Sequence, residues 1–124
     1  MSALTPTGKG LIQLMGAAPR GPKREGLFAL WLTVRVIEDL GQSPAPPERG
    51  HRRRVTALEQ RLSSQALPGP LRRGINGTLL ALKEADRPQV PALLSQLAAP
   101  AREAIGPEAG DLLLRAAREQ RPRR

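Results

Sequence analysis

An all-α fold, a small bundle of five to six short helices with no sheet, is the fold class that the sequence predicts. The 124 residues suffice for one ordinary domain and are too few for two independent cores of typical size. Leu and Ala abound while Val and Ile number four each, which favours helices over strands. Thirteen prolines fall mostly in clusters, and because proline cannot continue a helix from within, these clusters divide the chain into helix-sized segments.

Residues 1–22 are expected to form a weakly ordered N-terminal segment with at most a weak helix. Lys9 precedes an apolar run that ends in small residues, which is the outline of a weak signal peptide. No acidic residue precedes Glu25, so an organellar presequence is an alternative. Because Gln13 and two glycines interrupt the apolar run, neither signal is convincing, and we expect a cytoplasmic protein.

A single helical domain is predicted over residues 23–120, and its first segment, about 23–40, is the expected central core helix. Gly41 is well placed to end that helix, and a stiff Pro-rich connector is predicted at 42–50. The expected core positions of this helix recur at helical spacing and include the only tryptophan of the chain: Leu27, Leu30, Trp31, Val34, Ile37 and Leu40.

Two middle segments, about 52–66 and 71–85, are predicted to pair as a helical hairpin. Each presents a stripe of apolar residues at helical spacing, namely Val55, Leu58 and Leu62 in the first and Leu71, Ile75, Leu79 and Leu82 in the second. Gly74 and Gly77 have no side chain, so they are expected to permit close contact with another helix at some cost in helix propensity.

The last two helices are predicted at about 90–105 and 108–120. Pro100 is expected to kink or divide the first of them, and Gly106-Pro107 makes a sharp turn between the two. The remaining residues, 121–124, are expected to be a disordered basic C-terminus.

The residues needed for catalysis are almost absent from the sequence. The chain has no cysteine, no tyrosine and one histidine, so thiolate metal sites, cysteine nucleophiles and a Ser-His-Asp triad find no support. We therefore expect a protein that is not an enzyme, with no catalytic residue, no cofactor and no metal site. The most apolar run, residues 27–34, is far shorter than the roughly 20 residues of a transmembrane helix, so no transmembrane segment is expected.

Positive charge is the most concentrated feature of the sequence. Lys and Arg number 20 against 11 Asp and Glu, which gives a formal charge of +9, and a dense cluster lies within residues 49–54. Arg side chains match phosphate geometry, so the cluster favours a polyanion, with mostly phosphate contact and little base readout. The predicted nucleic-acid-binding residues are this cluster and the basic residues that a hairpin could bring beside it: Arg49, His51, Arg52, Arg53, Arg54, Arg61, Arg72 and Arg73.

Two other interpretations of the same sequence stay open. GC-rich coding would enrich Arg together with Ala, Gly and Pro, and the arginines would then only solvate the bundle and pair locally. Alternatively, the chain is a helical protein–protein interaction module, an adaptor or a homodimer, that docks through Val55, Leu58 and Leu62 or through the ridge of Leu93, Leu94 and Leu97. Phosphate binding weakens steeply with salt, whereas an apolar interface survives, so salt distinguishes the two kinds of partner.

Overall fold

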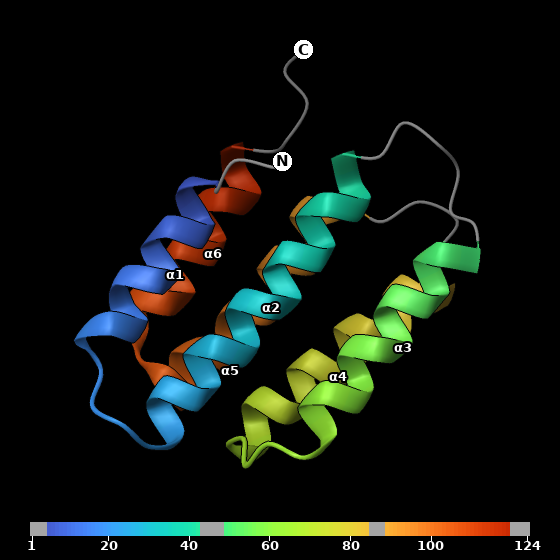
Figure 1. The fold of residues 1–124 in the computed structure, drawn as a ribbon. Helices are drawn as coiled ribbons and strands as arrows, with labels where there is room; N and C mark the ends of the chain where they lie inside the picture. The colour runs from blue at the N-terminus through green and yellow to red at the C-terminus, as the bar shows by residue number, and fades with distance from the viewer. Residues whose placement is uncertain (1–4, 43–48, 85–88, 120–124) are drawn as a thin grey trace.

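The computed structural model describes residues 5–42, 49–84 and 89–119, and the side chains within those ranges except at 40–42 and 49–51. This part of the chain forms α-helices and no strand, which confirms the predicted all-α fold (Figure 1). The helices are α1 (Pro6–Ala17), α2 (Pro22–Gln42), α3 (Arg49–Ser63), α4 (Gly69–Glu84), α5 (Val90–Ile105) and α6 (Pro107–Glu119).

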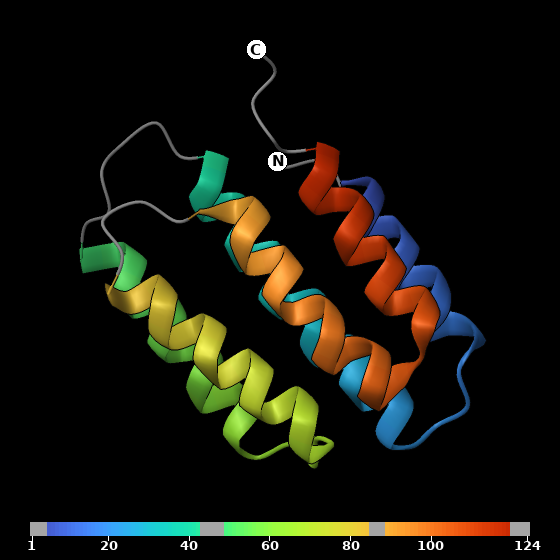
Figure 2. The same cartoon turned by 180° about the vertical axis from the view of Figure 1, so that it is seen from behind.

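The helices form two layers of three, and successive helices run in opposite directions (Figures 1 and 2). We call α1, α2 and α3 the N-terminal layer and α4, α5 and α6 the C-terminal layer. The second layer retraces the first in reverse, so that α6 packs on α1, α5 on α2 and α4 on α3. The predicted hairpin of the two middle segments is confirmed as α3 and α4, which the Lys83–Glu59 ion pair also joins.

The hydrophobic core lies between the two layers and is made chiefly of leucine. The amphipathic stripe of each helix turns toward the opposite layer, because only there can its apolar side chains leave water. Every helix contributes a fully buried side chain, for example Leu11, Leu30, Val55, Leu79, Leu94 and Leu113.

The N-terminal segment contains the helix α1, at the place where the sequence predicted a weaker helix. Thr5 caps it, since its Oγ1 accepts a hydrogen bond from the backbone N–H of Gly8 at 3.1 Å, and Pro6 occupies the first turn. Leu11 is fully buried in the contact with α2 and α6. The cap and this tertiary burial both stabilise α1.

The connector predicted at 42–50 is shorter than expected at both ends. Helix α2 continues through Gly41 to Gln42, and α3 begins at Arg49, three residues before its predicted start at 52. A glycine within a helix costs only about 1 kcal/mol, which neighbouring turns can offset. Residues 43–48 lie outside the described residues, as do 1–4, 85–88 and the predicted basic C-terminus at 121–124.

Trp31 does not lie in the core, contrary to the prediction. Its side chain is only partly buried, on the outer edge of α2, whereas Leu27, Leu30, Val34 and Ile37 of the same predicted stripe are buried. Trp31 is the member of that set farthest around the helix from its buried centre, so the indole covers the edge of the core and not its middle.

Glycine permits close helix contact at one of the two positions predicted for it. A Cβ atom at Gly74 of α4 would lie 2.6 Å from Cγ of Pro100 in α5, so only glycine fits there. A Cβ atom at Gly77 would meet nothing within 4 Å, so that position faces open space. Pro100 does not divide α5, which continues on both sides of it as one helix.

Candidate nucleic-acid interface

The basic residues are divided unequally between the two layers. Among residues 5–39 and 52–65, which hold the described side chains of the N-terminal layer, nine are basic and four are acidic. Among residues 66–84 and 89–119, which cover the C-terminal layer, six are basic and five are acidic. The nine are Lys9, Arg20, Lys23, Arg24, Arg35, Arg52, Arg53, Arg54 and Arg61. The positive potential of the described surface is therefore concentrated on the N-terminal layer.

The predicted arginine cluster occupies the first turns of α3 and does not form one face. Successive residues of a helix are rotated by about 100°, so Arg52, Arg53 and Arg54 point in three directions, all of them exposed. Arg54 turns toward α2, where its Nη2 donates a hydrogen bond to Oδ2 of Asp39 at 3.0 Å. Arg49 and His51 lie in the same first turns, but their side chains are outside the described part of the structure.

The other predicted site residues lie at the opposite end of the hairpin. Because α3 and α4 are antiparallel, Arg72 and Arg73 at the start of α4 are near the end of α3, together with Arg61 (Figure 1). Arg61 is eight residues from Arg53, or about 12 Å along the helix axis. The sequence therefore predicted as one patch what the fold separates into two clusters.

Two of these three arginines also have partners within the chain. The guanidinium of Arg61 lies over the ring of Phe28 in α2, 5.5 Å from its centroid. Arg72 donates from Nη2 to the backbone carbonyl of Gln65, in the segment between α3 and α4. Arg73 is exposed and makes no ion pair with the residues that the structure describes.

The outer face of α2 carries a row of two aromatic rings between two arginines, which the sequence analysis did not single out. Arg24, Phe28, Trp31 and Arg35 are spaced by four, three and four residues, which places them on one side of a helix. The rings of Phe28 and Trp31 are 6.0 Å apart and inclined by 32°, and the guanidinium of Arg35 lies 5.6 Å from the Trp31 centroid. The only two aromatic residues of the chain thus lie together on its basic layer.

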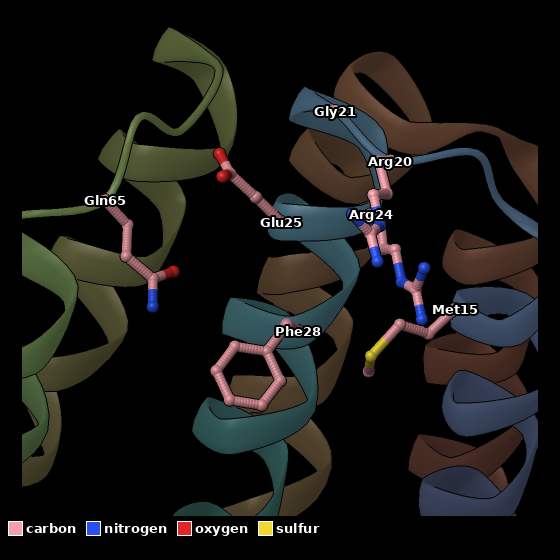
Figure 3. Close-up of a pocket in the computed structure, with 7 residues that line it drawn as sticks. All are labelled: Met15, Arg20, Gly21, Arg24, Glu25, Phe28 and Gln65. Carbon is pink, nitrogen blue, oxygen red and sulfur yellow. The ribbon is translucent and has the colours of Figure 1, made fainter.

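A pocket of about 490 Å³ opens beside this row, between the α1–α2 turn, the first half of α2 and the segment that follows α3 (Figure 3). Its lining combines apolar, cationic and hydrogen-bonding side chains. The lining residues are Met15, Arg20, Gly21, Arg24, Glu25, Phe28 and Gln65. Volumes of about 300–1,000 Å³ are usual for pockets that bind small molecules.

Gln65 is held at the edge of this pocket by its own backbone. Its N–H donates to the carbonyl of Leu62 at 3.1 Å, and its carbonyl accepts the hydrogen bond from Arg72. Its side-chain Oε1 is buried and accepts no hydrogen bond from the residues described. A buried acceptor of this kind gains free energy when a donor reaches it, so Gln65 marks a position where a bound group with an N–H or O–H would be stabilised.

The sequence did contain a signal for the aromatic row, but not for the whole pocket. The row was missed because Trp31 was assigned to the core. Arg24, Phe28 and Arg35 were therefore not grouped with Trp31 on one surface. A helical projection of residues 22–42 places all four on the side opposite Leu30 and Ile37, which indicates a surface role. No local pattern indicated Gln65, because its contribution depends on the contact between α3 and α2.

Glu38 is the buried acidic residue of the N-terminal layer. It is 5% exposed on α2, and burial raises its pKa above the ordinary value of 4.5. A hydrogen bond of 2.8 Å from the Thr5 hydroxyl acts in the opposite direction, and the neighbouring charge of Asp39 raises the pKa further. This carboxyl group therefore links the start of α1 to α2.

Comparisons with known proteins return no match: no family model, no curated protein and no solved structure resembles this chain. In the described ranges, no helix is both long enough and apolar enough to cross a membrane. The same ranges contain no group of three or more His, Cys, Asp or Glu side chains arranged to hold a metal ion.

Proposed function

We propose that this protein is a non-catalytic nucleic-acid-binding protein that contacts phosphates through its N-terminal layer, without strong sequence specificity. The unequal division of charge carries the proposal, because nine basic residues stand against four acidic ones on this layer. Arg20, Arg24, Arg52 and Arg53 are exposed there and make no ion pair with the residues described, so their guanidinium groups are available to phosphates.

The aromatic row of α2 favours single strands over duplexes as the ligand. Proteins that bind single-stranded nucleic acid combine a basic surface with aromatic rings on which bases stack. Phe28 and Trp31 are partly exposed between arginines, and a guanidinium plane over a ring offers a further stacking surface. Bases in a duplex are already stacked on one another and would not reach these rings.

The alternative function, a helical protein–protein interaction module, gains no support from the fold. The two apolar ridges on which it rests, Val55, Leu58 and Leu62 on α3 and Leu93, Leu94 and Leu97 on α5, are buried within the chain itself. The exposed large apolar side chains among the described residues are Ile12, Leu80 and Leu114, on three different helices. Scattered exposed apolar residues are normal for a monomer.

Fluorescence anisotropy with labelled DNA and RNA, each as a single strand and as a duplex, tests the proposal. We expect saturable binding that is tighter for single strands and that weakens at least tenfold between about 50 and 200 mM salt, as counterion release from several phosphates requires. Absence of binding at the lower salt concentration, or binding that salt does not weaken, would contradict phosphate contact and favour a protein partner.

A matched pair of double variants tests which layer binds. Arg52→Gln with Arg53→Gln removes two exposed charges from α3, and Arg115→Gln with Arg118→Gln removes two exposed charges from α6. Because both pairs change the net charge equally, a difference between them reports position and not overall charge. We expect the α3 pair to lower the affinity and to reduce the salt slope by up to about two units, and the α6 pair to change neither. Equal effects of the two pairs would contradict an interface on the N-terminal layer.

A further inference from the structure

We propose that the pocket between the α1–α2 turn, α2 and Gln65 binds one nucleoside monophosphate and prefers a base that carries an exocyclic amino group. This pocket lies on the proposed interface, so the identity of its ligand rests on the proposed function: one nucleotide of a bound strand would occupy it.

The pocket has a cationic end and an acceptor end. Figure 3 shows Arg20 and Arg24 on the side of α2 that faces α1, near Met15, whereas Glu25 extends to the opposite side, toward the segment that carries Gln65. Phe28 lies between the two ends. A ligand that fills this pocket therefore has an anionic group at one end, hydrogen-bond donors at the other and an apolar middle.

The cationic end suits a phosphate. Arg20 and Arg24 are exposed, and neither makes an ion pair with Glu25 or with any other residue that the structure describes. Two guanidinium groups offer several N–H donors in the forked arrangement that matches phosphate oxygens.

The acceptor end suits an amino-bearing base edge. A Glu25 carboxylate accepts hydrogen bonds, and Oε1 of Gln65 is a buried acceptor that receives no hydrogen bond from the residues described. Adenine, cytosine and guanine have an exocyclic amino group to donate there, whereas uracil has none, and its one N3–H lies between two carbonyl oxygens that a carboxylate repels. A fatty acid also has an anionic end and an apolar body, but it has no donor for Gln65.

The middle of the pocket suits a planar ring. Phe28 is held in place by the Arg61 guanidinium over its ring and by Trp31 beside it. Met15, whose thioether adapts to irregular shapes, lines the pocket from α1. A base that lies against Phe28 gains the stacking contact that aromatic side chains offer to single-stranded nucleic acids.

Isothermal titration calorimetry of the full chain at low salt with AMP, CMP, UMP and inorganic phosphate tests this assignment. We expect saturable binding of AMP and CMP, at least about tenfold weaker binding of UMP, and weaker binding still of inorganic phosphate. Equal affinity for AMP and UMP would overturn the base preference, and AMP binding no tighter than inorganic phosphate would overturn the pocket.

Variants assign the two ends of the pocket. Arg24→Gln should weaken the binding of AMP and the binding of UMP by a similar factor, because both nucleotides carry the phosphate. Glu25→Gln should reduce the ratio of AMP affinity to UMP affinity toward one, because the amide can also donate to a carbonyl oxygen. Arg115→Gln on α6 removes the same charge as Arg24→Gln and should leave both affinities unchanged, and circular dichroism checks the folding of each variant. An unchanged ratio in Glu25→Gln would contradict the acceptor end.

Failure of this assignment is distinguishable from failure of the proposed function. If labelled strands bind in a salt-dependent manner while AMP gives no saturable heat, the pocket assignment is wrong and phosphate contact by the N-terminal layer stands. If AMP binds with the expected preference while strands do not bind, the pocket stands as a nucleotide site and the strand-binding function is wrong.

Discussion

The two layers of the bundle differ in how closely their helices approach one another. In the C-terminal layer, Gly74 faces the ring of Pro100, and a Cβ atom at Gly110 would lie 2.0 Å from Cγ of Arg102 and 3.0 Å from the carbonyl oxygen of Ala98. In the N-terminal layer, the bulky side chains of Met15, Phe28 and Arg61 stand between neighbouring helices. Close contact leaves no room for a ligand, whereas large amphipathic side chains leave a pocket and an exposed row of rings.

The difference is consistent with the proposed function, in which the C-terminal layer mainly supports the fold and the N-terminal layer binds the ligand. The C-terminal layer is nearly balanced in charge, and its helices approach closely at Gly74 and Gly110, where there is little room for a larger side chain. The N-terminal layer shares the core but presents its arginines and aromatic rings to solvent. Substitutions in the C-terminal layer should therefore change stability, and substitutions on the surface of the N-terminal layer should change binding more than stability.

The largest expected effect is the loss of a core side chain from the C-terminal layer. Leu97 of α5 is fully buried beside the Gly74–Pro100 contact. Leu97→Ala removes buried methyl groups and leaves a cavity in a closely packed region, so the free energy of unfolding should fall by about 2–5 kcal/mol. Urea denaturation followed by circular dichroism measures it. A loss well below this range would mean that the layer collapses easily around the vacancy and is not closely packed.

The next effect compares two glycines on the same helix. Gly74→Ala should destabilise the protein by about 1–3 kcal/mol, because the added methyl meets the rigid ring of Pro100. Gly77→Ala should stabilise it by up to about 1 kcal/mol, because the methyl enters open space and alanine favours the helix. Thermal and urea denaturation of the two variants check the sign of each change. Two changes of the same sign would contradict the close approach of α4 and α5.

A smaller effect concerns the buried carboxyl group of the N-terminal layer. Burial raises the pKa of Glu38, so the folded protein holds this proton more tightly than the unfolded chain does. Ionisation of Glu38 therefore lowers stability as the pH rises from about 4.5 through the raised pKa. Glu38→Gln removes this penalty and keeps an acceptor for Thr5.

We expect the Glu38→Gln variant to be more stable than the natural protein at pH 7, and the gain to shrink as the pH falls toward 4.5. Urea denaturation at several pH values measures the gain. A gain that is independent of pH, or a loss at pH 7, would show that partners of the ionised carboxylate outweigh its burial.

The smallest effect on stability is expected for Asp39→Asn. The ion pair of Asp39 with Arg54 joins α2 to α3, but 48% of the Arg54 side chain and 28% of the Asp39 side chain are exposed. Exposed ion pairs contribute about 0–1 kcal/mol to stability, so the free energy of unfolding should change little. The variant frees Arg54 and removes a negative charge from the basic layer, so affinity for single-stranded nucleic acid should rise. Weaker binding would contradict phosphate contact near the start of α3.

The sequence by itself determined where most of the helices lie and that α3 pairs with α4. Proline clusters and apolar periodicity located the segments that became α2 to α6 within a few residues of their ends, because both signals are local properties of the chain. The α3–α4 hairpin and the role of Gly74 were also predictable, since a short connection pairs adjacent helices and a glycine indicates where another backbone can approach.

Only the tertiary structure decided which residues share a surface. Antiparallel packing placed Arg72 and Arg73 beside Arg61 at the end of α3, away from Arg52 and Arg53 at its start, because proximity of two residues on neighbouring helices depends on helix direction and register. Trp31 fell at the edge of the core because two layers cover only part of the circumference of α2. The pocket combines three segments, and no local pattern encodes it, because Gln65 lines the same pocket as Phe28 and Arg24 only once α3 has packed against α2.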